Sequence, residues 1–220
     1  MTDNTRLLSW SEAQALLELY GVAMNGETIV KADLTKLTKK YAFPHVLKGY
    51  SAFIAHKKEH GLVRLGINNA EELSEAYAEL AALMKGWPGQ NEIVLQPTAP
   101  QGIELVLGAR RDQTFGPVLM FGLGGTLVEV LNEVVFAMAP LDVQAALAML
   151  ERWPRRRLLD GYRGWPAVNR PELAGLLVNL GNLINEHAEI QEIDLNPVIV
   201  GPNGLVLIDV RVTVENSSII

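Results

Sequence analysis

Three oxygen-bearing side chains alternate with apolar ones near the carboxyl end of the sequence. Glu192, Asp194 and Asn196 in the segment QEIDLNPVIV are interleaved with Ile193 and Leu195. Alternate residues of a strand share a face, so the three polar side chains would point one way while the apolar pair enters the core. Carboxylate and amide oxygens suit a hard cation such as Mg²⁺. The same pattern also fits an ordinary, half-solvated sheet edge.

A second apolar segment, LVLIDVRV, places Asp209 in an expected strand paired with the first. A buried carboxylate needs neutralisation, and a cation shared with Asn196 would provide it. Alternatively, Asp209 bonds to the backbone or pairs with Arg211. The residues alone leave both roles open.

The glycine-rich segment FGLGG, residues 121–125, follows an apolar strand pattern and precedes a possible helix. Glycines there would bare backbone N–H groups, which could bind a phosphate at the start of the helix. The alternative is a turn that requires glycine only for positive φ angles. The segment is neither a Walker loop nor a complete GxGxxG motif.

Basic residues and histidines gather in the segment KGYSAFIAHKKEHG, residues 48–61. Lys48 is expected at the end of a strand, where it could meet a phosphate as a point charge. A loop histidine such as His56 could act as a nucleophile toward a phosphoryl group. Exposed lysines and histidines of loops also commonly have no specific role.

One more cluster combines Glu104, Arg110, Arg111 and Asp112 across an expected strand and turn. An arginine there could offset the charge that develops on a transferring phosphoryl group. A surface salt bridge explains the same residues. His187 is interpreted as structural, because a cation is favoured at the end of a helix.

The pattern of apolar residues and turn signals predicts an α+β fold whose elements position these side chains. Ser9 with Glu12, and Asn69 with Glu72, have the spacing of a capping box at the start of a helix. The expected helices are 9–21, 33–41, 69–86, 141–152 and 171–187, and the expected strands are 45–48, 62–67, 93–95, 103–107, 117–121, 190–200 and 205–212. We expect two domains, 1–90 and 91–220.

Composition narrows the possible partners. The 220 residues are 49% hydrophobic and carry a formal net charge of -6, so they lack the basic field that would hold nucleic acid or a membrane surface. The absence of cysteine excludes disulfides and thiolate sites. No signal-peptide pattern or membrane-spanning apolar run is present. We therefore expect a cytoplasmic protein with no nucleic-acid or membrane partner.

Together, in this order along nearly the whole chain, these segments resemble the ATP-grasp domain of ADP-forming acyl-CoA synthetases, and more distantly the succinyl-CoA synthetase β subunit. The most specific stretch is GIELVLGARRDQTFGPVLMFGLGGTLVEV, residues 102–130. Shorter supporting segments are LLELYGV, VLK, SAFIAHK, APL, GYRG and EIDLNPVIV.

The resemblance implies an ATP-grasp fold, in which two lobes clasp ATP between sheets. It places Lys48 on the phosphates and Arg110, Glu104, Gly124 and Gly125 in the nucleotide pocket. It implies Mg²⁺ held by the set Asp194, Asn196 and Asp209, and an adenine hinge formed by Glu92, Ile93, Val94 and Leu95.

The resemblance also implies an activity, that of an acid–thiol ligase subunit. Such enzymes interconvert acyl-CoA, ADP and phosphate with carboxylic acid, CoA and ATP through a phosphohistidine, and His56 matches the relay histidine. Because 220 residues hold no CoA-binding domain, the resemblance implies a heteromer with a CoA-binding α subunit, which would also handle the acid, CoA and phosphate.

The sequence departs from the family pattern at several positions. Ala52 and Phe53 replace a Pro-Asp pair, and Leu62 replaces a glycine. Glu133 stands for an aspartate and Ala137 for an arginine, so we expect one anion contact or salt bridge to be missing. These departures motivate one alternative, a degenerate module that binds nucleotide without turnover. A further alternative is an ATP-grasp ligase that joins an acid to an amine without phosphohistidine.

Overall fold

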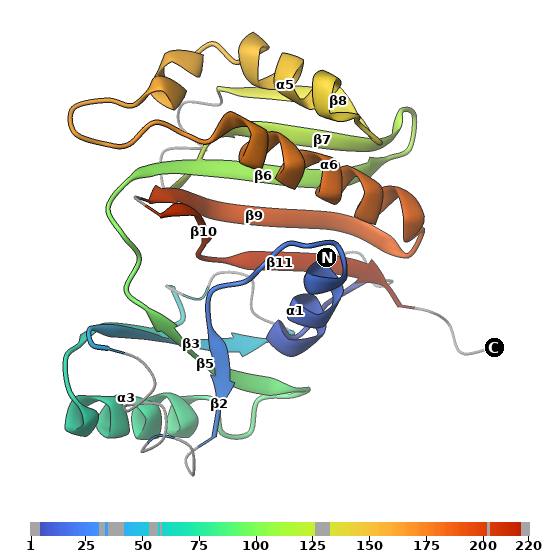
Figure 1. Ribbon diagram of the computed structural model, residues 1–220. Coiled ribbons are helices and arrows are strands. Elements are labelled where there is room, and N and C mark those ends of the chain that lie inside the picture. The colour runs from blue at the N-terminus through green and yellow to red at the C-terminus, as the bar shows by residue number, and fades with distance from the viewer. Residues whose placement is uncertain are drawn as a thin grey trace. The chain divides into compact units, whose positions relative to one another are not determined.

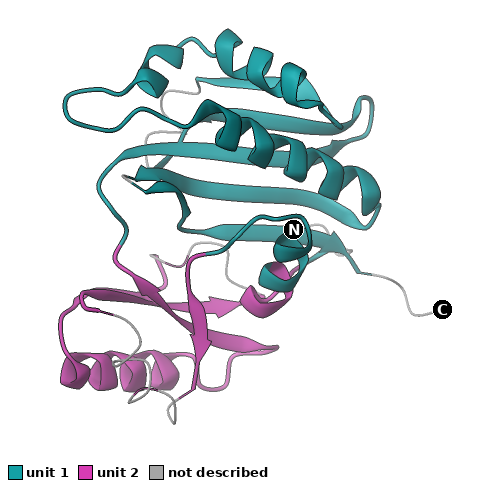
Figure 2. Ribbon diagram, viewed as in Figure 1, with its two compact units in different colours: residues 1–6, 14–24, 99–220 teal, residues 7–13, 25–98 magenta. Residues whose placement is uncertain are grey.

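The computed structural model describes residues 5–30, 34, 42–52, 57, 59–125, 133–201 and 203–216. The chain forms two compact units (Figure 2). The larger unit comprises residues 1–6, 14–24 and 99–220, and the smaller unit residues 7–13 and 25–98. The break therefore falls between Thr98 and Ala99, whereas the sequence analysis places it after residue 90.

The smaller unit is a four-stranded antiparallel sheet with one helix on a face (Figure 1). Its strand order is β2 (Glu27–Ile29), β5 (Asn91–Pro97), β3 (His45–Ser51) and β4 (Val63–Ile67). Helix α3 (Ala70–Leu83) covers one face, and Leu47, Leu62 and Leu80 are buried in the core of this unit. Because β5 pairs with both β2 and β3, it belongs to this unit.

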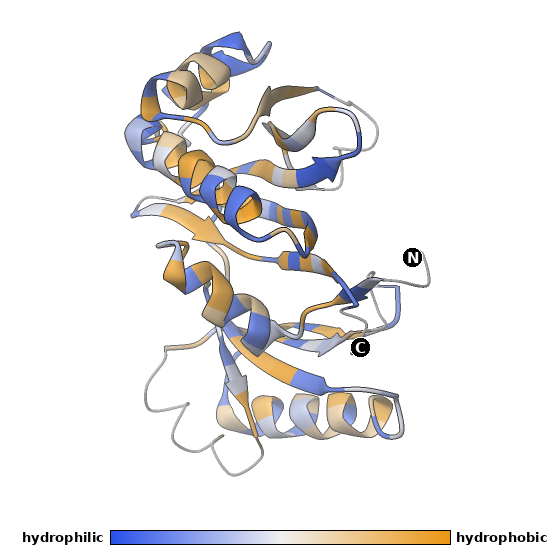
Figure 3. Ribbon diagram, turned by 90° about the vertical axis from the view of Figure 1, so that its right-hand side faces the viewer, coloured by the Kyte–Doolittle hydropathy of each residue, from blue (hydrophilic) through white to orange (hydrophobic). Residues whose placement is uncertain are grey.

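Helix ends follow the predicted capping. The Asn69 side chain accepts hydrogen bonds from the backbone N–H groups of Glu71 and Glu72, at 3.1 and 2.9 Å, which confirms the start of α3. In Figure 3, α3 at the bottom carries hydrophobic and hydrophilic residues in alternation around its axis, as a helix with one buried side does.

The opening helix α1 (Trp10–Leu19) has the reciprocal bonds of a capping box. Ser9 N–H donates to Glu12 at 2.8 Å, and Glu12 N–H donates to the Ser9 hydroxyl at 3.3 Å. The helix ends at Leu19, and the chain turns at Gly21, whose φ of 68° is unfavourable for other residues.

The larger unit is built on a mostly antiparallel sheet with two helices on one face (Figure 1). The strand order is β1 (Thr5–Leu7), β11 (Val210–Glu215), β9 (Ile190–Gly201), β6 (Ile103–Asp112), β7 (Gly116–Leu123) and β8 (Val134–Met138), and β10 (Gly204–Leu207) also pairs with β9. Helices α5 (Val143–Arg152) and α6 (Arg170–Glu186) bury their apolar sides.

Two sequence expectations differ from the structure, and a third is not tested by it. Lys48 is the fourth of the seven residues of β3, not the strand end, because β3 continues to Ser51 along β5. The expected strand 205–212 is divided into β10 and β11, because Ile208 and Asp209 leave the ladder. Apart from Leu34, the expected helix 33–41 lies outside the described residues.

Candidate functional site

One face of the larger sheet carries polar side chains, and we call it the polar face: Glu104 and Arg110 of β6, Glu192, Asp194 and Asn196 of β9, and Arg211 of β11. On β9, Ile193 and Leu195 are buried, while the alternate residues are exposed or partly exposed, as predicted. Strand pairing places Asp194 between Gly108 and Arg211. The polar face lies opposite the apolar face that packs on α6.

Asp194 forms an ion pair with Arg211, with 3.0 Å between Oδ2 and Nη2. Burial raises the pKa of the Asp194 carboxyl above its ordinary value, although the nearby Arg211 guanidinium acts in the opposite direction. A second positive charge near Asp194, in addition to that of Arg211, would therefore favour the ionised form of the Asp194 carboxylate.

The glycine segment after β7 joins the polar face at Asn196 and Glu104. Gly125 N–H donates to Asn196 Oδ1 at 3.0 Å, and Gly124 N–H donates to the Glu104 carbonyl at 2.8 Å. A side chain at Gly125, whose φ is 76°, would overlap the Glu104 carboxylate. The prediction that these glycines bare their N–H groups is wrong, because both groups are bonded within the chain. The segment instead positions Glu104 next to Asn196.

Asp209 bonds to the backbone, as one of the alternatives for this residue predicted, but it does not pair with Arg211. Its backbone carbonyl accepts from Asn196 N–H at 3.2 Å, and its Oδ1 accepts from Val210 N–H at 3.0 Å. Arg211 pairs with Asp194 instead. Asp209 and Asn196 are therefore hydrogen-bonded neighbours, and a cation shared between their side chains stays a prediction.

The polar face fits a magnesium ion that is shared with a ligand. Among the residues that the structure describes, no three His, Asp or Glu side chains gather as a metal cage. Mg²⁺ is commonly held by one or two carboxylates and by substrate phosphates and water. The oxygens of Asn196, Asp209 and Asp194 would supply that partial set, with Asp194 held at present by Arg211.

Lys48 lies on the face of the smaller sheet opposite α3, and only 7% of its surface is exposed. It pairs with Val94 on β5 and Val63 on β4. Tyr50, two residues further along β3, shares this face, and its ring lies 4.8 Å from that of Trp10 and 4.2 Å from Lys57 Nζ. Sequence reasoning missed this aromatic pair, although the period of two along β3 relates Tyr50 to Lys48.

The four residues expected at the adenine hinge are all buried. Ile93 and Leu95 belong to the core against α3, and β2 and β3 pair with β5 on both sides of them. Glu92 shares the face of Lys48, but its carboxylate accepts from Ser11 N–H, at 3.2 and 3.4 Å, in the first turn of α1. Val94 alone lies on that face without a capping role.

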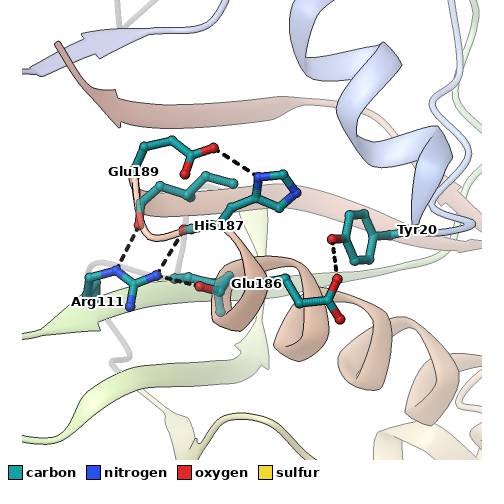
Figure 4. Close-up of polar contacts among 7 residues, drawn as sticks. Tyr20, Arg111, Glu186, His187 and Glu189 are labelled. Carbon is teal, nitrogen blue, oxygen red and sulfur yellow. Dashed lines mark hydrogen bonds and ion pairs between the residues drawn. The ribbon is translucent and has the colours of Figure 1, made fainter. Parts of the chain in front are cut away.

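Two members of the 104–112 cluster have structural roles. The Arg111 guanidinium donates to the carbonyls of Ile184, His187 and Ile190 and so caps the end of α6 (Figure 4). Asp112 accepts from the backbone N–H groups of Phe115 and Thr114, which lowers the pKa of its carboxyl. Arg110, by contrast, is exposed and lies opposite Glu192.

The end of α6 is fixed by further polar contacts. His187 Nδ1 lies 2.9 Å from Glu189 Oε1, and the Tyr20 hydroxyl donates to Glu186 Oε2 at 2.7 Å (Figure 4). The bond to Glu186 raises the pKa of Tyr20. The structural interpretation of His187 agrees with this arrangement.

The departures from the family pattern have local explanations where the structure describes them. Leu62 is fully buried in the core of the smaller unit. Glu133 forms a two-pronged ion pair with Arg155, both contacts at 2.5 Å, so a salt bridge is present at this position. Ala137 is partly buried in β8. His56 and Phe53 lie outside the described residues.

No helix in the described part of the chain is both long and apolar enough to cross a membrane.

Comparison with known proteins gives consistent matches. A family model for the ATP-grasp domain matches residues 1–214. The chain is 33% identical over 205 residues to the acetate–CoA ligase [ADP-forming] I subunit beta of Pyrococcus furiosus, covering 91% of this chain and 88% of that subunit. It is also 33% identical over 208 residues to the 4-hydroxybutyrate–CoA ligase [ADP-forming] of Nitrosopumilus maritimus, but spans only 30% of that protein.

A solved structure matches the fold over nearly its whole length. It is acetyl-coenzyme A synthetase 1 of Ca. Korarchaeum cryptofilum, in complex with coenzyme A and Mg-AMPPCP, with a phosphohistidine segment pointing towards the nucleotide-binding site. The TM-score is 0.81 at 34% identity, covering 95% of this chain and 92% of the other.

Proposed function

The chain belongs to the ATP-grasp domain family, and we propose that it is the nucleotide-binding subunit of an ADP-forming acyl-CoA ligase. The observation that carries the proposal is the match to the acetate–CoA ligase subunit beta, at 33% identity over 91% of this chain and 88% of that subunit. The remaining ligase machinery would reside in a companion chain, meaning the CoA-binding chain of the same organism.

In this proposal the subunit binds Mg²⁺ with ATP or ADP. The cation would supply charge neutralisation of the phosphates, with Asn196 and Asp209 as its protein ligands. Glu104, positioned beside Gly125, would accept a hydrogen bond from the nucleotide, and Arg110 would offset phosphoryl charge. Asp194 would join the cation set when Arg211 releases it.

Lys48, on β3, would bind the nucleotide phosphates. Its burial favours a strong charge interaction, because screening by water is reduced there. Gly124 would contribute to the nucleotide pocket by allowing the chain to pass close to the backbone of Leu105, and not by donating its N–H to the nucleotide. Burial argues against direct side-chain contact by Ile93, Val94 and Leu95, and the hydrogen bonds from Ser11 N–H argue against direct contact by Glu92.

The overall reaction would interconvert acyl-CoA, ADP and phosphate with carboxylic acid, CoA and ATP. His56 would carry the phosphoryl group between the companion chain and ADP, through a P–N bond that forms and breaks once per turnover. The likeness to the Korarchaeum enzyme, whose phosphohistidine segment points towards its nucleotide site, supports this role.

The test combines the purified chain with its companion chain, ATP, CoA and a series of carboxylic acids. We expect ADP and acyl-CoA only when both chains are present, with acid-labile labelled phosphate trapped on wild-type protein but not on His56→Ala. Release of AMP would contradict the mechanism. Turnover without trapped phosphate would favour an acid–amine type of ATP-grasp ligase.

The degenerate, non-catalytic alternative is less favoured. Its motivation came from Leu62, Ala137 and Phe53, and the core position of Leu62 accounts for the first without a change in chemistry. Full activity of an assembled Lys48→Ala or His56→Ala enzyme would revive it.

A further inference from the structure

The connection between α5 and α6 concentrates positive charge in an otherwise acidic chain. Residues 152–163 contain five arginines and one aspartate, whereas the whole chain has a net charge of -6. The segment includes a 3₁₀ helix, Arg156–Asp160, and forms the loop at the left of Figure 1. All five arginines are exposed: Arg152, Arg155, Arg156, Arg157 and Arg163.

The carboxylates around this segment are already engaged by arginines. Arg155 pairs with Glu133, and Arg156 lies 3.7 Å from Glu151. Arg170 pairs with both Glu151 and Asp160, each at 2.7 Å.

Three arginines are left over. Within the described part of the chain, no carboxylate lies at ion-pair distance from Arg152, Arg157 or Arg163. Their charge therefore faces outward without an internal counter-charge from these residues.

Arg163 also occupies a backbone conformation that is unfavourable for its type. Tyr162 and Trp165 form an antiparallel bridge, with Trp165 N–H donating to the Tyr162 carbonyl at 2.9 Å. The two turn residues between them, Arg163 and Gly164, have φ angles of 46° and 90°. Such two-residue turns favour Asn-Gly, so the arginine at this position carries backbone strain.

The same turn exposes two aromatic rings. Tyr162 is 48% and Trp165 is 44% exposed, and the Arg163 guanidinium lies 5.3 Å from the Tyr162 ring centre. Tyrosine, tryptophan and arginine are the residue types most enriched at the energetic centres of protein interfaces.

Buried anchors hold this surface in place. Trp153 is fully buried, donates from Nε1 to the Glu133 carbonyl at 2.9 Å and packs edge-on against Phe121. Leu159 is also buried, and its carbonyl accepts from Val168 N–H at 2.9 Å. A surface fixed in advance loses little conformational entropy when a partner binds.

We infer that the arginine hairpin surface, formed by Arg152, Arg157, Tyr162, Arg163 and Trp165, docks on an acidic surface of the companion chain. The inference rests on the proposed function. A module that makes up 30% of a single-chain ligase needs surfaces that meet the other 70%. The net negative charge of the chain disfavours a polyanion such as RNA, which would be repelled at longer range, and favours a local acidic patch on a protein.

The test measures the dissociation constant of the wild-type chain and its companion chain at 50 and 300 mM NaCl. For Arg157→Glu/Arg163→Glu we expect binding weakened at least tenfold at low salt, with a reduced salt dependence. The matched control, Arg64→Glu/Lys85→Glu, makes the same charge change in the smaller unit and should bind like wild type. All variants should retain wild-type affinity for ATP, which reports an intact fold.

A second measurement locates the contact without changing charge. A photo-crosslinking residue in place of Tyr162 should attach to the companion chain. The same residue in place of Phe115, which is 63% exposed on another turn, should not.

Unchanged companion affinity in the double variant, or no crosslink from position 162, would overturn the inference. Loss of binding to a 20-nucleotide RNA with unchanged companion affinity would overturn it too and assign the surface to a polyanion. If the two wild-type chains bind through this surface but release no ADP, the proposed function fails and the docking surface stands.

Discussion

Glu92 and Glu104 have the same chemistry and were both expected at a nucleotide, but their surroundings differ. Glu92 is 6% exposed and its carboxylate is occupied by Ser11 N–H at the start of α1. Glu104 is exposed on the polar face, beside Gly125 and near Asn196. The first carboxylate holds the fold together, whereas the second is available to a ligand.

The comparison teaches that a residue's place on a strand face is a weaker guide to function than whether its polar atoms are already satisfied. Removing a buried carboxylate that accepts internal hydrogen bonds lowers the stability of the protein. Removing an exposed carboxylate costs the protein little stability. A change in ligand affinity after such a removal therefore indicates a lost contact with the ligand. The two glutamates should therefore separate stability from binding.

Glu92→Ala should produce the largest effect on stability. Removal of the carboxylate leaves Ser11 N–H unsatisfied, and we expect a loss of about 2 kcal/mol in the free energy of unfolding. Urea denaturation measures it, and the folded variant should bind ATP as wild type does. Unchanged stability with a large loss of ATP affinity would reverse the assignment of this residue.

Glu104→Ala should show the opposite behaviour. Loss of one hydrogen bond to the nucleotide predicts about tenfold weaker ATP binding, equivalent to ~1.4 kcal/mol. The unfolding midpoint should stay within the error of wild type. Calorimetric titration checks the affinity, and equal ATP affinity in the variant would remove Glu104 from the proposed site.

Asn69→Ala sharpens the stability half of the comparison, since Asn69 caps α3 much as Glu92 caps α1. Loss of this cap should lower the free energy of unfolding by about 1 kcal/mol. ATP affinity should not change. A drop in affinity here would mean that general destabilisation, and not a lost contact, explains the effects of the other variants.

The smallest expected effect concerns Asp194 and is a change in how Mg²⁺ binding depends on pH. Because burial raises its pKa, the folded protein takes up this proton at a higher pH than the unfolded chain does. The stability that this proton contributes is present at low pH and is lost as pH rises through the raised pKa. Mg²⁺ requires the ionised form, so its binding should weaken as pH falls through that pKa.

The measurement is the shift in Tm produced by Mg²⁺ and ADP between pH 7 and pH 5. We expect the shift to shrink with falling pH in wild type, and Asp194→Asn to flatten that dependence. An identical pH dependence in the two proteins would remove Asp194 from the cation set.

Much of the fold could be predicted because its signals are local. The caps at Ser9 and Asn69, the period of two in β9 and the helical stripe of α6 each lie within a few residues. Less visible were the extension of β3 past Lys48 and the split at Asp209, which depend on pairing with distant strands. The domain boundary was displaced for the same reason, since β5 is assigned by its partners.

The sequence predicted which residue types gather at the site, but not which of their polar atoms are already bonded within the chain. Sequence patterns selected Asn196, Asp194 and Glu104, which the structure gathers on one face with Gly125. They could not reveal that Asp194 pairs with Arg211 or that Arg111 caps α6, because those bonds join segments that are far apart in sequence. Tyr50 was overlooked because an aromatic residue in a strand has no chemical signature of its own.

The most direct test of the central claim is calorimetric titration of ATP and ADP into the isolated chain, with and without Mg²⁺. The account predicts one nucleotide bound per chain, dependence on Mg²⁺, and at least a hundredfold loss of affinity in Lys48→Ala, corresponding to ~2.7 kcal/mol. Lys85→Ala, on the exposed turn after α3, should bind as wild type does. Absence of nucleotide binding in the wild-type chain would contradict the account.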